Sequence, residues 1–204
     1  MYRFLVVALF SGCSFPVFHH APNGAIFTVC PAGVSYTYGI RSELDENIPS
    51  MFFDVQEGFK YWSQQVEGVT FKYTNKNANI LVVLENEMKM PTKKTLRGEV
   101  RNAGFCIRKL MAENCIVVGI IAISNTFYND YPVEEARKLT QSIVRHEIGH
   151  LFGFTNTNDF TQLMHHNIDK DTVHPLELSP FEKSALDCVY DEECDETLLE
   201  WPVW

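Results

Sequence analysis

The feature that most restricts the fold is a long amphipathic segment that ends in the residues RHEIGHLFG. Acidic residues follow a proline at its start and Gly153 stands at its end, as helix start and stop signals require. His146 and His150 are four positions apart, so both imidazoles project from one helix face, with Glu147 beside them. Residues 133–153 are therefore predicted to form a helix that presents two histidines and a carboxylate together.

Two histidines at this spacing can bind one zinc ion, and the neighbouring Glu147 can take a proton from a water that the metal activates. The motif H-E-x-x-H is short and also occurs by chance, so the surrounding residues have to support it. Gly153 lets the chain turn back towards the metal, and Met164 follows eight positions after Asn156. The sequence thus predicts one catalytic zinc ion.

This pattern resembles that of the metzincin metalloproteases, H-E-x-x-H-x-x-G-x-x-H followed by a methionine turn under the metal. The spacing is most similar to the matrixin branch, and the resemblance covers most of residues 34–190. It implies that His146 and His150 are zinc ligands. Glu147 would then be the general base, and Met164 the methionine of the turn.

Asn156 stands where the family has its third histidine. An amide oxygen can coordinate zinc, but it is neutral and weakly basic, so it should hold the metal less firmly than an imidazole or a carboxylate. The third ligand is therefore Asn156 itself, His166, or Asp159, of which the last requires the turn to shift. Two further interpretations stay open: a degenerate site without activity, and a gluzincin arrangement with Glu177 or Glu182 as the third ligand.

Apolar periodicity and turn residues predict the remaining elements. These are a strand at 34–41, a helix at 48–66, strands at 69–73, 79–85, 103–111 and 115–124, and a C-terminal helix that begins at Ser179 with a capping box to Glu182. No regular element is predicted in the charged residues 86–102. We expect an α+β, metzincin-like (zincin-like) domain, with a twisted mixed sheet of about five strands, two long helices and a short C-terminal helix.

Residues 1–13, MYRFLVVALFSGC, have a positive start, a short apolar run and small residues before the cysteine, which is typical of an export signal. They resemble a bacterial lipoprotein signal, which implies a lipid anchor at Cys13, although Phe10 departs from the usual aliphatic residue. Ordinary secretion and a buried N-terminal strand are the alternatives. We expect an exported protein, extracellular, periplasmic or membrane-anchored, with a tether or short pro-segment at 14–33 and the protease domain at 34–204.

Export also permits disulfides. The pairs that close the shortest loops are Cys106–Cys115 and Cys188–Cys194, with single buried cysteines as the alternative. Residues 86–115 contain no histidine, so the second, structural zinc of the family is not expected. The acidic run DEECDE lacks the spacing of a calcium cage, and calcium is therefore not indicated.

The formal net charge of −9 argues against a nucleic-acid partner, because binding phosphates requires a basic face. We expect a monomer that meets the membrane only through the lipid anchor, and whose partner is a protein or peptide substrate. Such a substrate could pair with the edge strand at 103–111. The predicted function is a zinc-dependent metalloendopeptidase. The alternative is a catalytically impaired metalloprotease-like domain that binds peptide or metal at the cell surface.

Overall fold

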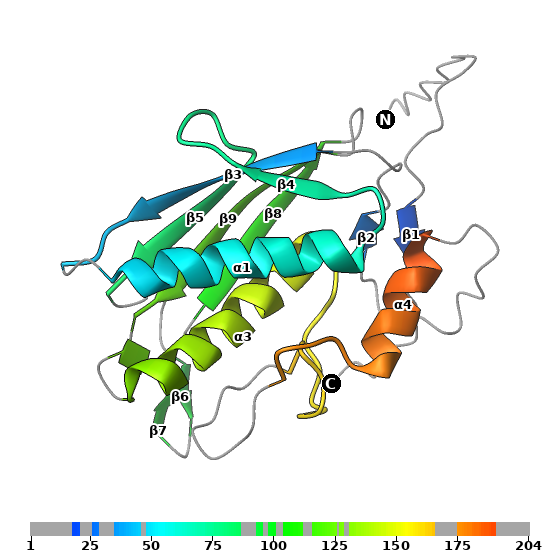
Figure 1. The fold of residues 1–204 in the computed structure, drawn as a ribbon. Helices are drawn as coiled ribbons and strands as arrows, with labels where there is room; N and C mark the ends of the chain where they lie inside the picture. Colours follow the sequence, from blue (N-terminus) through cyan, green and yellow to red (C-terminus); the bar gives the residue numbers. More distant parts are fainter. Residues whose placement is uncertain are drawn as a thin grey trace, which may run out of the picture.

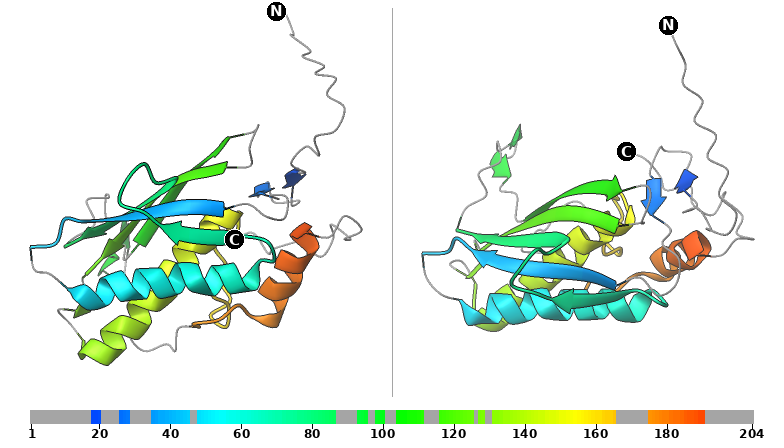
Figure 2. Two further views of the ribbon diagram at one scale, coloured as in Figure 1. Left: turned by 45° about the horizontal axis from the view of Figure 1, so that its top comes forward. Right: turned by 90° about the horizontal axis from the view of Figure 1, so that it is seen from above.

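The computed structural model shows a mixed sheet with two long helices on one of its faces (Figures 1 and 2). It describes residues 18–20, 26–28, 35–45, 48–86, 93–95, 98–100, 104–111, 116–125, 127–128, 131–165 and 175–190. The five strands of the sheet lie in the order β4-β3-β5-β9-β8. Their bounds are Ser35–Ser42 (β3), Thr70–Tyr73 (β4), Ile80–Glu85 (β5), Gly104–Met111 (β8) and Ile116–Ser124 (β9).

Four of these strands run parallel, and β8 pairs antiparallel with β9 at one edge of the sheet. Mixed pairing within five strands confirms the predicted α+β class at this level. The apolar run of β5 is explained by its central place in the sheet, between β3 and β9, where Ile80, Val82, Val83 and Leu84 are buried. The two edge strands of the sheet are β4, which is parallel to its neighbour, and β8, which is antiparallel.

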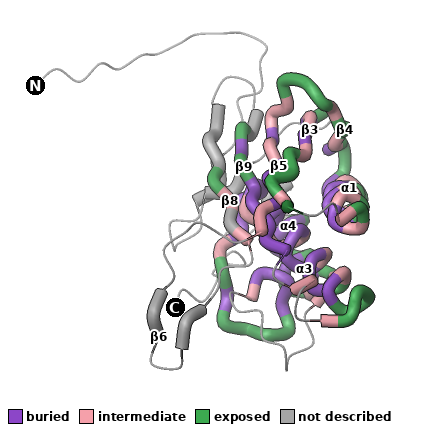
Figure 3. The backbone as a smooth tube through the Cα atoms, turned by 90° about the vertical axis from the view of Figure 1, so that its left-hand side faces the viewer, coloured by how far each residue is buried: buried purple, intermediate pink, exposed green. Residues whose placement is uncertain are grey.

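The helices α1 (Pro49–Gln65) and α3 (Val133–Phe152) form the second layer, and α4 (Pro180–Tyr190) is the short third helix. The apolar residues of α1 recur every three or four positions and face the sheet and α3, where Phe59 and Trp62 are fully buried. Buried residues gather where the two long helices meet the sheet (Figure 3). Trp62 also donates an Nε1–H bond to the carbonyl of Arg145 at 2.8 Å, which fixes α1 against the helix that carries the histidines.

Two short hairpins were not predicted from the sequence. One pairs β1 (Phe18–His20) with β2 (Ile26–Thr28) inside the segment expected to be a tether. The other pairs β6 (Lys93–Thr95) with β7 (Gly98–Val100) inside the charged stretch for which no element was expected. Strands of three residues are too short to show a period of two, so their apolar pattern carries no signal.

Several predictions fall outside the described residues. These are the signal at 1–13 with its lipid anchor at Cys13, and both predicted disulfides, since Cys115 and Cys194 lie there. Among the helices that the structure does describe, none is long and apolar enough to cross a membrane.

Candidate metal centre

His146 and His150 lie side by side near the C-terminal end of α3, with ring centroids 4.7 Å apart and ring planes at 89°. Each ring points its Nδ1 at a backbone carbonyl: His146 at Leu163 O (3.0 Å) and His150 at Phe154 O (2.7 Å). A carbonyl can only accept, so each Nδ1 carries the proton and each Nε2 keeps its lone pair. Metal-binding histidines adopt the same orientation: the protein accepts the Nδ1–H bond, and Nε2 is the nitrogen that coordinates the ion.

The ring of His146 is held in its neutral form. Burial and, after it, the charge of His150 lower the pKa of His146 to about 3, against the opposing effect of its bonds to Leu163 and Asn156. The imidazole is therefore uncharged at neutral pH, and its lone pair is available without the loss of a proton.

Glu147 lies between the two histidines in sequence and points towards the edge strand. The residue is only 6% exposed, and burial raises the pKa of its carboxyl to about 8. Its Oε2 has no hydrogen-bond partner within the described part of the chain. A buried carboxyl oxygen without a partner is costly in a purely structural role, and a perturbed pKa at such a position is characteristic of functional sites.

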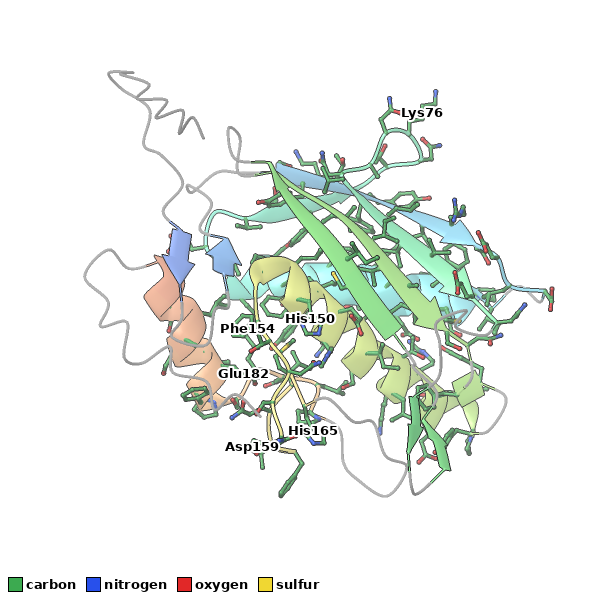
Figure 4. All side chains as sticks on the ribbon, turned by 180° about the vertical axis from the view of Figure 1, so that it is seen from behind. Lys76, His150, Phe154, Asp159, His165 and Glu182 are labelled. Atoms are coloured by element: carbon green, nitrogen blue, oxygen red, sulfur yellow. The ribbon has the colours of Figure 1, made fainter. Side chains whose placement is uncertain are left out.

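The chain reverses direction after α3 because Gly153 adopts the left-handed conformation, with φ at 109°. Its N–H group bonds to the carbonyls of Gly149 and His150. The loop then closes on itself, since the Thr157 N–H donates to the Met164 carbonyl at 2.9 Å. Figure 4 shows this loop, in yellow, descending from the end of α3 beside His150.

Closure of the loop brings Asn156 to the histidine pair, because its side chain hydrogen-bonds to that of His146. Leu163 already occupies Nδ1 of His146, so Nε2 is the nitrogen that remains for this contact. The amide that replaces the third histidine of the metzincin motif therefore reaches the ring that would share a metal with it.

The other candidates for a third ligand are placed differently. The Asp159 carboxylate accepts bonds from the Thr161 N–H (2.9 Å), the Thr161 hydroxyl (2.6 Å) and the Gln162 amide (3.1 Å). Among the described residues, no three His, Cys, Asp or Glu side chains are grouped so that they could hold a metal. Asp159 therefore does not complete a group with His146 and His150, and His166 lies outside the described residues.

Glu182 makes two sets of hydrogen bonds, of which the sequence predicted only the first. It forms the predicted capping box, since its own N–H donates to Ser179 Oγ (3.2 Å) and its carboxylate accepts from the Ser179 N–H (2.7 Å). The same carboxylate also accepts from the Leu163 N–H (3.1 Å) and the Met164 N–H (2.9 Å). Four hydrogen bonds thus engage Glu182 away from the histidines, and Glu177 is exposed. Within the described residues neither glutamate forms a group with His146 and His150, so the structure gives the gluzincin alternative no support.

Met164 is fully buried beneath α3, as expected for the methionine of the turn. Gly149 makes room for it, because a β-carbon at position 149 would lie 2.6 Å from the sulfur of Met164 and 3.2 Å from Cζ2 of Trp62. The glycine inside the motif thus allows the loop to pack directly under the helix turn that carries His146 and His150.

No protein-family model and no curated protein matches the chain. Solved structures do match it. A crystal structure of myroilysin aligns with a TM-score of 0.50 and 14% sequence identity, covering 78% of this chain and 84% of that chain. A second myroilysin structure has a TM-score of 0.49 and 13% identity, with 80% and 82% covered. The first alignment shows that the chain has a fold like that of myroilysin, a metalloprotease, and it does not single out the matrixin branch.

Proposed function

We propose that the chain is a zinc-dependent endopeptidase of the metzincin type, with matrixin-like spacing of its metal-binding residues. One observation carries the proposal. His146 and His150 both point Nδ1 at a backbone carbonyl, so Nε2 is the nitrogen with which each ring could bind a shared ion. Glu147 beside them is buried, and its Oε2 has no hydrogen-bond partner within the described part of the chain. The metalloprotease-like fold supports the same conclusion.

The residues present suit a zinc ion. His146, His150 and Asn156 would hold it, since two neutral imidazoles and an amide oxygen are acceptable zinc donors and leave a position for water. When bound, zinc supplies Lewis-acid polarisation of a peptide carbonyl and lowers the pKa of water to about 7.

Glu147 would transfer the proton. It accepts a proton from the attacking water while the water oxygen forms a bond to the carbonyl carbon of the substrate. It then gives that proton to the amine nitrogen as the carbon–nitrogen bond breaks. Its burial suits both steps, because a poorly hydrated carboxylate is a stronger base than an exposed one.

The substrate would be a peptide in extended form. Strand β8 forms one edge of the sheet, and Gly104 at its start lies against Glu147. A peptide that adds to this edge by backbone pairing would therefore pass close to the general base. An exported location, whether extracellular, periplasmic or anchored to a membrane by a lipid at Cys13, is part of the same proposal.

The test is zinc content and cleavage of a mixed peptide library, measured on the purified wild type and on Glu147→Ala. We expect the variant to lose cleavage while it keeps zinc and fold. Glu134→Ala, which removes an exposed carboxylate from the same helix, should cleave as the wild type does. Equal cleavage by Glu147→Ala would overturn the mechanism. A wild type that binds zinc but cleaves nothing would identify the catalytically impaired alternative.

A further inference from the structure

One buried carboxylate that the proposed mechanism does not use lies next to the metal centre. Glu182 at the start of α4 is fully buried, and its carboxylate accepts three backbone N–H bonds, from Leu163, Met164 and Ser179. Figure 4 places it between α4 and the loop that follows α3. A fully buried carboxylate with three donors is an ordered part of the structure, and its charge acts on the groups that it contacts.

The start of α4 is itself fixed to the helix layer. The Leu178 N–H donates to the hydroxyl of Tyr61 on α1 at 2.7 Å. Further back, the Ser142 hydroxyl on α3 donates to the Pro175 carbonyl at 3.0 Å. These two bonds attach the segment before α4 to the long helices, and so fix the place of Glu182 next to the methionine turn.

A single peptide group joins this carboxylate to a histidine of the metal centre. The peptide between Leu163 and Met164 donates its N–H, on Met164, to Glu182 Oε1 at 2.9 Å. The carbonyl of the same peptide, on Leu163, accepts the Nδ1–H of His146 at 3.0 Å. The order is therefore carboxylate, peptide group, Nδ1 of the imidazole and then Nε2 on the far side of the same ring.

Hydrogen bonds in such a chain strengthen one another. A carboxylate on the N–H side draws the peptide dipole towards it and leaves the carbonyl oxygen more negative. The Nδ1–H of His146 then donates more strongly, and electron density on Nε2 rises. Partners of this kind around metal-binding histidines typically contribute about 10- to 100-fold in metal affinity.

We propose that Glu182 is a positioning residue of the metal centre, which orients and polarises His146 through the Leu163–Met164 peptide group. The zinc arm of this inference rests on the proposed function. The effect on the imidazole does not, because the hydrogen-bonded chain is complete without a metal.

The competing explanation is that Glu182 only caps α4. Ser179→Ala tests it, since this change removes the hydroxyl that accepts the Glu182 N–H and leaves the bonds to Leu163 and Met164 in place. Glu182→Gln removes the charge and one acceptor oxygen. The pair of variants therefore separates the cap from the contact with the methionine turn.

Two readouts are made on full-length wild type, Glu182→Gln and Ser179→Ala. The first is zinc affinity by competition with a chelator. The second is ¹⁵N imidazole NMR of metal-free protein, in which the His146 Nδ1 signal and the exchange of its proton with water are followed. His150 serves as an internal control, because its Nδ1 bonds to Phe154 rather than to the turn.

We expect Glu182→Gln to weaken zinc binding about tenfold, to shift the His146 Nδ1 signal and to speed exchange of its proton. Ser179→Ala should change none of these.

An unchanged His146 signal in Glu182→Gln overturns the inference even if zinc binding falls. If the wild type binds no zinc, the proposed function fails and the NMR readout alone decides the inference. If Glu182→Gln does not fold, Glu182→Asp, whose shorter side chain cannot reach both turn N–H groups unchanged, is judged by the same signal.

Discussion

Gly104 at the start of β8 lies against Glu147 of α3, so closely that a β-carbon at position 104 would stand 2.8 Å from Glu147 Oε1 and 2.6 Å from Cγ2 of Ile143. No L-residue with a side chain fits there unless Glu147 and Ile143, or the strand itself, move. The edge strand thus contacts the residue that we propose as general base. Because position 104 has no side chain, the edge strand and Glu147 can approach each other this closely.

Gly104→Ala should therefore impair catalysis more than metal binding. The added methyl group displaces the Glu147 carboxylate, so we expect kcat/KM to fall at least about tenfold, with zinc content unchanged. Overpacking should also lower the free energy of unfolding by about 1–3 kcal/mol. Peptide cleavage, zinc content and denaturant unfolding check these three expectations.

Gly119→Ala is the matched control for that change. A β-carbon at position 119 on β9 would lie 2.7 Å from Cδ2 of Leu151, so it strains the same interface of sheet and α3 without touching Glu147. It should lower stability by a similar amount and keep most of the activity. Equal loss of activity in both variants would show that general packing is responsible, and would contradict the specific contact with Glu147.

The fold was largely predictable because its elements are specified by local patterns. The helix that carries His146 and His150 has acidic residues in its first turn and a glycine in the left-handed conformation at its end. The capping box of Ser179 and Glu182 is equally local, and the structure contains it. Such signals involve residues a few positions apart, which a single sequence displays.

The contacts that were not predicted are those between distant parts of the chain. Glu182 bonds to Met164 across 18 positions, and no pattern in the sequence marks that pairing. Gly104 and Glu147 meet only because β8 is the edge strand beside α3. The placement of Asn156 likewise depends on the bond between Thr157 and Met164, which forms only once the loop is closed.

Asp54 provides a test of how α1 is held to α3. Its carboxylate is fully buried and accepts bonds from the Tyr128 hydroxyl (2.9 Å), the Gln141 amide (2.8 Å) and the Arg137 guanidinium (3.3 Å). Asp54→Ala leaves these donors without their acceptor, and we expect it to lower the free energy of unfolding by about 2–3 kcal/mol. Urea denaturation followed by circular dichroism measures the loss.

The control for this prediction is Glu57→Ala on the same helix. Glu57 pairs with Lys60 at 3.2 Å, but both side chains are more than half exposed. Exposed pairs contribute about 0.2–1 kcal/mol, so the expected change is small. A loss as large as that of Asp54→Ala would mean that any carboxylate on α1 matters equally, against the specific network around Asp54.

Gly149 and Met164 should be energetically coupled. Gly149→Ala would push against the Met164 sulfur, and we expect it to cost about 1–3 kcal/mol of stability. Met164→Ala alone removes a fully buried side chain and should cost about 2–5 kcal/mol. In the double variant the smaller side chain leaves room for the new methyl group, so the combined loss should be less than the sum. Additive losses in unfolding experiments would contradict direct packing of the turn under α3.

The third ligand is decided by replacing Asn156 and His166 separately. Because the Asn156 side chain contacts His146, Asn156→Ala should weaken zinc binding at least tenfold, which corresponds to about 1.4 kcal/mol. Asn156→His should strengthen binding, since imidazole is a better zinc donor than an amide oxygen. His166→Ala should leave the dissociation constant unchanged. The opposite pair of results is an unchanged zinc dissociation constant in Asn156→Ala and weaker zinc binding in His166→Ala. It would assign the third position to His166 and leave Asn156 as a hydrogen-bond partner of His146.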